Sequence, residues 1–218
     1  MTLLFILAIT IGIRHAFEPD HMAAVLSVST QSNSLSATAK QGAIWGVGHT
    51  ITLFIFSMIL MGLNIEIDRN IFVLFEFIIG LVLIWMGFDV VNKSKVLLHD
   101  RGSNHIESEI TENNNKTKLS LKSLGIGLLH GAAGSGVIIA LITTTIDSIY
   151  LKFAYIALFS FGLIISMSLL SILMTMPMHR NFKIIPLRYF KVITGTLAIL
   201  IGMKILYQSS AQISTLLT

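Results

Sequence analysis

Long apolar stretches separated by short polar ones dominate the hydropathy pattern of this chain. A transmembrane helix needs about 20 consecutive apolar residues to cross a hydrocarbon core about 30 Å thick, and it must satisfy its backbone hydrogen bonds within the segment. The pattern predicts six such helices, over residues 2–28, 42–63, 71–92, 121–145, 151–175 and 187–208. We therefore expect an all-α polytopic membrane protein with six transmembrane helices.

The composition supports this expectation and restricts the chemistry. Charged residues make up 12% of the chain, whereas a soluble domain carries about 25%. The chain contains no cysteine, which excludes disulfide frameworks and thiolate metal sites. A bound metal would have to use nitrogen and oxygen ligands.

The lysine and arginine residues predict the orientation, because those in short loops stay on the cytoplasmic side. An outside N-terminus leaves only Arg69, Lys152 and Lys204 in outer segments and places the basic residues around 40, 93–122 and 180–191 inside. We expect a multi-pass protein of the cell membrane with both termini outside and the 93–119 loop in the cytoplasm. Since these charges flank membrane helices, they do not predict nucleic-acid binding.

The chain also shows an internal repeat. A shift of 115 residues aligns 12–16 with 127–131 and 75–87 with 190–202, and a shift of 114 aligns the helices between them. Each half contains three predicted helices, an odd number, so the two halves must have opposite orientations in the membrane. Inverted repeats that enclose a central site at interrupted helices are a recurrent transporter architecture.

This repeat predicts the domain organisation. We expect a first three-helix repeat over 1–92, a polar cytoplasmic linker over 93–119 and a second three-helix repeat over 120–218. Pro19 in the first helix and the glycine-rich stretch 125–136 in the fourth predict that helices 1 and 4 are interrupted.

The first predicted helix carries a polar cluster within the sequence GIRHAFEPDHMAAV. Its polar side chains are Arg14, His15, Glu18, Asp20 and His21. An ionised side chain at the bilayer centre costs about 2.5–3.5 kcal/mol on insertion scales, so such residues usually mark a functional site. Because Pro19 lacks a backbone N–H, we expect the helix to kink or break beside this cluster.

A metal site is the first interpretation of the cluster. Imidazole and carboxylate groups suit divalent transition metals, and His15, Asp20 and His21 are the proposed ligands. Arg14 and Glu18 lie four residues apart, a spacing that permits an ion pair in a helix. The alternative is a structural network of ion pairs and hydrogen bonds that holds the kink.

Two further helices contribute histidines that also suit a metal. His49 lies in WGVGHT and His130 in GLLHGAAGSG. Either histidine, taken alone, is equally well explained as a hydrogen-bonded packing residue. Trp45, Trp85, Tyr150 and Tyr207 are expected to be interface anchors.

The motif RHAFEPDH resembles the signature of the nickel/cobalt transporter (NiCoT, or NicO) superfamily, and the match falls on His15, Asp20 and His21. The sequences GVGHT, with His49, and HGAAGSG, with His130 and Ser135, are similar to elements of its smaller UreH-type branch of urease accessory membrane proteins. The resemblance implies transport of nickel or cobalt and, as partners beside lipid and metal, a nickel-enzyme maturation system such as that of urease. It implies no permanently bound cofactor and no enzyme activity.

Two other functions fit parts of the sequence. The AGSG stretch at 133–136 is similar to the nucleophile motif of rhomboid-type intramembrane serine proteases, with Ser135 as the nucleophile, although Ala133 replaces the first glycine. The last two predicted helices lack the histidine base that this mechanism needs. A metal-delivery accessory protein that does not itself transport is the second alternative.

Overall fold

The structure, a computed structural model, is helical throughout its regular elements in the residues that it describes. These are residues 2–29, 34–63, 69–96, 117–133, 142, 146–176 and 187–216. The helices are α1 (Thr2–His15), α2 (Pro19–Ser29), α3 (Leu35–Leu63), α4 (Arg69–Val96), α6 (Ile149–Thr175) and α7 (Leu187–Leu216). A further helical segment covers 117–133.

The first predicted membrane helix is broken, as expected. Helix α1 ends at His15, α2 begins at Pro19, and the two helices meet at an angle of 61°. Pro19 has no amide to donate, so it fits the first turn of α2 without losing a hydrogen bond. The carbonyl of Glu18 accepts the first bond of α2, from the amide of Met22 at 3.0 Å. The break therefore follows from the position of a single proline.

Among the described residues, four helices are long and apolar enough to cross a membrane, namely α3, α4, α6 and α7, and the bent pair α1 and α2 makes a fifth if it is counted as one span. In the fourth predicted span, 121–145, the structure describes an uninterrupted helix up to residue 133, so the glycines at 125, 127 and 131 do not break it, and residues 134–136 of the glycine-rich stretch lie outside the described residues. The architecture is that of a polytopic helical membrane protein.

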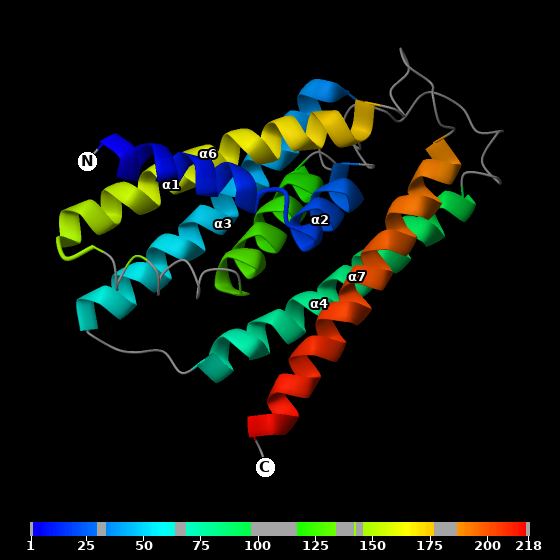
Figure 1. Ribbon diagram of the computed structural model, residues 1–218. Helices are drawn as coiled ribbons and strands as arrows, with labels where there is room; N and C mark the ends of the chain where they lie inside the picture. Colours follow the sequence, from blue (N-terminus) through cyan, green and yellow to red (C-terminus); the bar gives the residue numbers. More distant parts are fainter. Residues whose placement is uncertain are drawn as a thin grey trace.

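The helices form two groups that meet at α2 (Figure 1). Helix α6 packs along both α1 and α3, α4 packs along α7, and α2 contacts α3, α4, α6 and α7. Trp45, Leu53, Phe159, Leu163 and Met167 are fully buried in the resulting core. Because α2 links both groups, the residues of its first turn lie at their junction.

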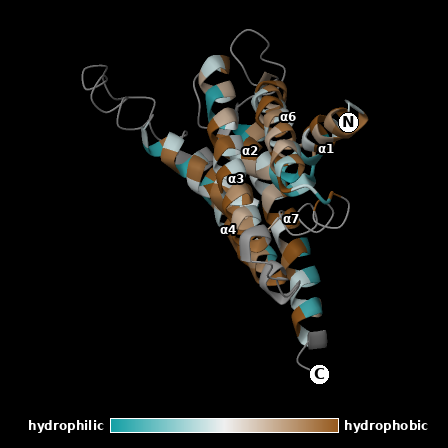
Figure 2. Ribbon diagram, turned by 90° about the vertical axis from the view of Figure 1, so that its left-hand side faces the viewer, coloured by the Kyte–Doolittle hydropathy of each residue, from teal (hydrophilic) through white to brown (hydrophobic). Residues whose placement is uncertain are grey.

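Hydrophobic residues predominate along the helices (Figure 2), and many of them are exposed. Leu3, Trp85, Tyr150 and Tyr207, for example, are exposed. In water such surfaces would be an aggregation hazard, whereas lipid solvates them. The exposed Trp85, Tyr150 and Tyr207 fit the expected role of interface anchors, but Trp45 does not, because it is buried in the core.

Glycines allow the helix backbones to approach closely at specific positions, as is common between membrane helices. A Cβ atom on Gly12 would collide with the carbonyl of Phe159, and one on Gly127 would collide with the carbonyl of Trp45. The first contact joins α1 to α6, and the second joins segment 117–133 to α3. These contacts fix the depth of His15 and His130, each three residues further along its helix.

Candidate metal centre

The helix break brings two histidines together. His15 is the last residue of α1, and His21 lies in the first turn of α2. Both side chains are buried, and their ring centroids lie 4.4 Å apart. A straight helix would place residues six positions apart about 9 Å apart along its axis, so the bend is what forms this pair.

A third histidine reaches the same place from α3. The ring of His49, which is fully buried, lies 5.2 Å from that of His15 and 5.4 Å from that of His21. One ring nitrogen from each of the three histidines lies within 4.8 Å of the other two. This is the spacing of groups that can converge on one metal ion. We refer to His15, His21 and His49 as the histidine triad.

His130 adds a fourth imidazole from segment 117–133. Its ring lies 5.4 Å from that of His21, and its Nδ1 lies 3.0 Å from the carbonyl oxygen of Ile126. A carbonyl only accepts, so Nδ1 must carry the hydrogen, and Nε2 is left with its lone pair. A backbone carbonyl that holds the second ring nitrogen is the usual support of a metal-binding histidine.

Glu18 gives His15 the same support. Its Oε1 lies 2.9 Å from Nδ1 of His15, so Nδ1 donates to the carboxylate and Nε2 keeps its lone pair. Glu18 thus contacts His15, and the expected ion pair with Arg14 is not formed, because the side chain of Arg14 is exposed. His15 and His130 therefore both present Nε2 as the potential ligand atom.

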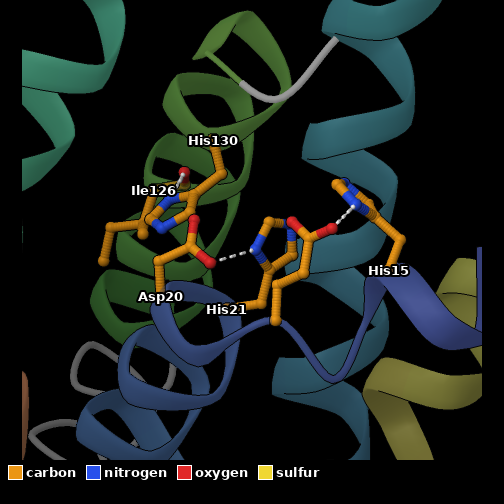
Figure 3. A network of polar contacts seen from close by, with 6 residues as sticks. His15, Asp20, His21, Ile126 and His130 are labelled. Carbon is orange, nitrogen blue, oxygen red and sulfur yellow. Dashed lines mark hydrogen bonds and ion pairs between the residues drawn. The ribbon is translucent and has the colours of Figure 1, made fainter. Parts of the chain in front are cut away.

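Asp20 lies on the other side of His21 (Figure 3). Its Oδ1 is 3.0 Å from Nδ1 of His21, but the contact lacks the alignment of a hydrogen bond. Glu18, Asp20 and His21 form a second group whose ligand atoms lie within 4.8 Å of one another. His21 is a member of both groups, one rich in nitrogen and one rich in oxygen.

Several buried nitrogen atoms of this cluster have no hydrogen-bond partner among the described residues. They are Nε2 of His15, both ring nitrogens of His21, both ring nitrogens of His49, and Nε2 of His130. A buried polar atom without a partner costs about 1–3 kcal/mol, so a cluster of them favours a bound water molecule or ion. Each neutral imidazole has one nitrogen with a lone pair, and converging lone pairs donate to a cation.

The donor set indicates which cations fit. Imidazole nitrogens with one or two carboxylates suit nickel, cobalt, zinc, copper(II) and iron(II), whereas magnesium and calcium prefer oxygen alone. The sequence contains no cysteine, so no thiolate can favour a softer ion. The arrangement can therefore bind a divalent transition metal.

The structure brings together all five proposed ligands, from α1, α2, α3 and segment 117–133. Pro19 starts α2, and Glu18 supports His15. Ser135 lies outside the described residues. Arg14, the remaining supporting residue named from the sequence, is exposed and, unlike Glu18, makes no ion pair with the described residues of the cluster.

Trp45 is a site residue that the sequence analysis missed. Its ring lies 4.9 Å from His21, 5.4 Å from His49 and 5.2 Å from His130. It precedes His49 by four residues on α3, the spacing that places two side chains on one helix face. That spacing was the available signal.

The fold and the cluster define the class of this protein: a polytopic helical membrane protein with a histidine and carboxylate centre buried among its helices. The chain is 30% identical over 203 residues to the urease accessory protein UreH of Bacillus sp. (strain TB-90), an alignment that covers 92% of this chain and 89% of that protein. The chain belongs to this UreH family, the branch of the NiCoT superfamily that its motifs resemble. No protein-family model and no solved structure matches the chain.

Proposed function

We propose that the protein carries a divalent transition-metal cation, nickel or cobalt before others, across the cell membrane through the centre formed by His15, Asp20, His21, His49 and His130. The observation that carries this proposal is the set of buried imidazole nitrogens that have no hydrogen-bond partner in the part of the chain that the structure describes. A purely structural network would satisfy its own polar atoms, because unsatisfied ones are costly in a membrane. A cation that comes and goes accounts for ligands that are held in place and left unpaired.

The similarity to UreH supports nickel as the cargo. The relative is named a urease accessory protein, and urease is a nickel enzyme. We propose a urease-type maturation system as the recipient of the metal. The relative's name also favours a second candidate, a protein that delivers metal to such a system without moving it across the membrane.

We further propose that the chain is a 3+3 inverted repeat of six transmembrane helices, with helices 1 and 4 interrupted. Pairs of glycine contacts support this. Gly12 contacts Phe159, and Gly127 contacts Trp45. Gly127 lies 115 residues after Gly12, and Phe159 lies 114 residues after Trp45. Each contact is thus the counterpart of the other under the repeat. A chance resemblance between apolar helices would not preserve both partners of a contact.

Helices α4 and α7 obey the same relation. Gly80 packs against Gly202, and Gly87 packs against Gly195. Under the shift of 115 residues, Gly80 corresponds to Gly195 and Gly87 corresponds to Gly202. The contact of Gly80 with Gly202 is therefore the repeat counterpart of the contact of Gly87 with Gly195. In transporters of this architecture the halves move relative to each other around a fixed central site. We propose such a movement here, with both termini outside and the 93–119 segment in the cytoplasm.

Metal flux into liposomes tests the proposal. Purified protein would be reconstituted, and the initial uptake of nickel, cobalt, manganese and zinc would be measured for wild type and for the variants His15→Ala, Asp20→Asn and His21→Ala. We expect each variant to lose at least about tenfold in flux, in line with the loss of a metal ligand or its support. His105→Ala, a histidine of the predicted linker, is the matched control.

Each result has a distinct meaning. Flux that depends on the three residues, with the control at wild-type rate, supports the carrier. Wild-type protein that binds nickel but does not move it would favour the delivery protein. Variants that insert normally and carry metal at the wild-type rate would refute the site itself.

A further inference from the structure

A cavity of about 340 Å³ opens beside the metal centre, between α2, α4 and α7. Its described lining includes Glu18 and Asp20 at the start of α2, Glu76 of α4, and Lys204 and Ser209 of α7. Two of these residues, Glu18 and Asp20, also belong to the oxygen-rich group around His21. The cavity therefore leads directly to one side of the centre.

The charge of the lining matches a divalent cation. The lining contains three acidic residues, Glu18, Asp20 and Glu76, and one basic residue, Lys204, which gives it a formal charge of minus two. A recess with an excess of one sign of charge between apolar walls raises the local concentration of the opposite ion and its association rate. The cavity is thus suited to attract a dication before it meets any histidine.

Ser209 is an independent sign that the cavity takes a polar ligand. Its side chain is 0% exposed, and its Oγ has no hydrogen-bond partner among the described residues. A serine of α7 normally bonds to a carbonyl of the preceding turn, as Ser210 does with Tyr207 at 2.9 Å. Ser209 is one of the residues that line the cavity, so an ion or water molecule bound there is a potential partner for its unpaired hydroxyl.

The size of the cavity indicates the state of the ion. Six water molecules occupy about 180 Å³ at about 30 Å³ each, which is less than the volume of the cavity. A divalent ion can therefore enter with its water shell, and oxygen ligands from the wall can bind it through that shell. The histidine triad, in contrast, requires direct contact with nitrogen and thus loss of water.

We propose that this cavity is an outer chamber that holds a hydrated divalent cation through Glu76, the Glu18 and Asp20 carboxylates and the Ser209 hydroxyl, before His21 passes it to the other two members of the histidine triad, His15 and His49. The inference rests on the proposed function. His21 suits the transfer because its ring contacts Asp20 on one side and the rings of His15 and His49 on the other. The chamber would accept hard and borderline dications alike, so selection falls to the triad.

The orientation of the helices places the chamber toward one side of the membrane. Glu76 lies in the first third of α4 and Ser209 in the last third of α7, and the two helices run in opposite directions (Figure 1). Both residues are therefore near the same end of the pair. With the proposed topology, this end faces outside.

The rate at which metal reaches the histidines tests the chamber. Trp45 contacts three of the histidines, so bound nickel should quench its fluorescence. In a Trp85→Phe background it is the only tryptophan of the two in the chain. Stopped-flow mixing of detergent-solubilised protein with nickel then gives the association rate, and mixing of the loaded protein with a chelator gives the dissociation rate.

We expect opposite effects from the two signs of charge. Glu76→Gln should slow association about tenfold, and Lys204→Gln should accelerate it, with dissociation changed less than twofold in both, because long-range charge acts mainly on association. Ser209→Ala should slow association about three- to tenfold, as expected for one lost hydrogen bond. The controls are Asp147→Asn, an exposed carboxylate elsewhere, and Ser210→Ala, the neighbouring serine.

The outcomes separate the chamber from the proposed function. If wild-type Trp45 is quenched by nickel but Glu76→Gln, Lys204→Gln and Ser209→Ala all associate at the wild-type rate, the chamber is wrong and the metal centre stands. If nickel does not quench wild-type Trp45, or quenches His15→Ala equally, the metal centre is wrong and the chamber falls with it. A rise in rate for Lys204→Gln cannot come from misfolding, so it supports the chamber directly.

Discussion

His49 offers the sharpest test of the idea that this centre is held ready for a cation. Both of its ring nitrogens are buried without a hydrogen-bond partner among the described residues, and the side chain is fully buried. Each unsatisfied nitrogen costs about 1–3 kcal/mol. Leucine has a similar size and carries no polar atom. His49→Leu should therefore stabilise the metal-free protein, by about 1–2 kcal/mol after the lost ring contacts with Trp45 and His21 are subtracted.

The same substitution should remove the response to metal. A ligand at 100 times its dissociation constant stabilises the protein that binds it by about 2.7 kcal/mol. For a chain of this length, 1 kcal/mol corresponds to about 2–4 °C in the melting temperature. We therefore expect saturating nickel to raise the melting temperature of wild type by about 5–10 °C. Without metal, His49→Leu should melt about 2–8 °C higher than wild type, and nickel should raise the melting temperature of this variant little.

Thermal unfolding in detergent, followed by tryptophan fluorescence, measures both effects in one series. His105→Leu in the predicted linker is the control for a histidine replaced by leucine. Metal-free His49→Leu that melts well below wild type would show that the imidazole is satisfied in place and stabilises the fold. A variant that retains the full nickel shift would show that His49 is not a ligand. Either result would refute the reasoning.

Three other predictions follow from the helix contacts and the chemistry of imidazole. Gly127→Ala should destabilise the protein by about 1–3 kcal/mol, because the added Cβ would collide with the Trp45 carbonyl. Gly125→Ala is the control in the same melting assay, since a Cβ at that position meets nothing within 4 Å. Equal stability of the two variants would contradict the close packing at Gly127. Pro19→Ala should reduce nickel flux at least about tenfold, because the break that brings His15 beside His21 would no longer be enforced. Nickel flux at the wild-type rate in this variant would mean that other contacts set the bend. Nickel flux should fall as the pH drops through the range in which free imidazole gains its proton, near pH 6.5, because a protonated ring cannot bind metal. The stabilisation of the protein by nickel should likewise be present above that range and lost below it. A flat flux profile between about pH 5 and 8 would contradict histidine ligation.

The sequence predicted the membrane helices well and their ends less well. Hydropathy reports where the apolar core begins and ends, whereas a helix continues beyond it while its backbone bonds are satisfied by water. Helix α4 accordingly extends to Val96 and α7 to Leu216, beyond the predicted ends at 92 and 208. The position of the break could be predicted because proline acts locally.

The content of the site could be predicted, but its geometry could not. His15, Asp20 and His21 share a motif that also contains Pro19, so a break beside them could be predicted, whereas the distance between the two histidine rings depends on the angle of the bend. The distance between His21 and His130 depends on how segment 117–133 packs against α3, through contacts such as that of Gly127 with Trp45. Trp45 itself was placed at the interface because indole is common there, and only tertiary packing shows that it is buried among the histidines.

The break between α1 and α2 has an electrostatic consequence of its own. In an uninterrupted helix the peptide dipoles of successive turns cancel internally, and partial charges remain only at the far ends. Here α1 ends at His15 and α2 begins at Pro19, so a negative helix end and a positive helix end both lie at the bend between the two helices. The first attracts a cation, the second favours the negative charge of Asp20 in the first turn of α2, and both belong to the backbone. Part of the field at the centre therefore comes from the main chain, and it does not titrate with pH as long as the break is kept.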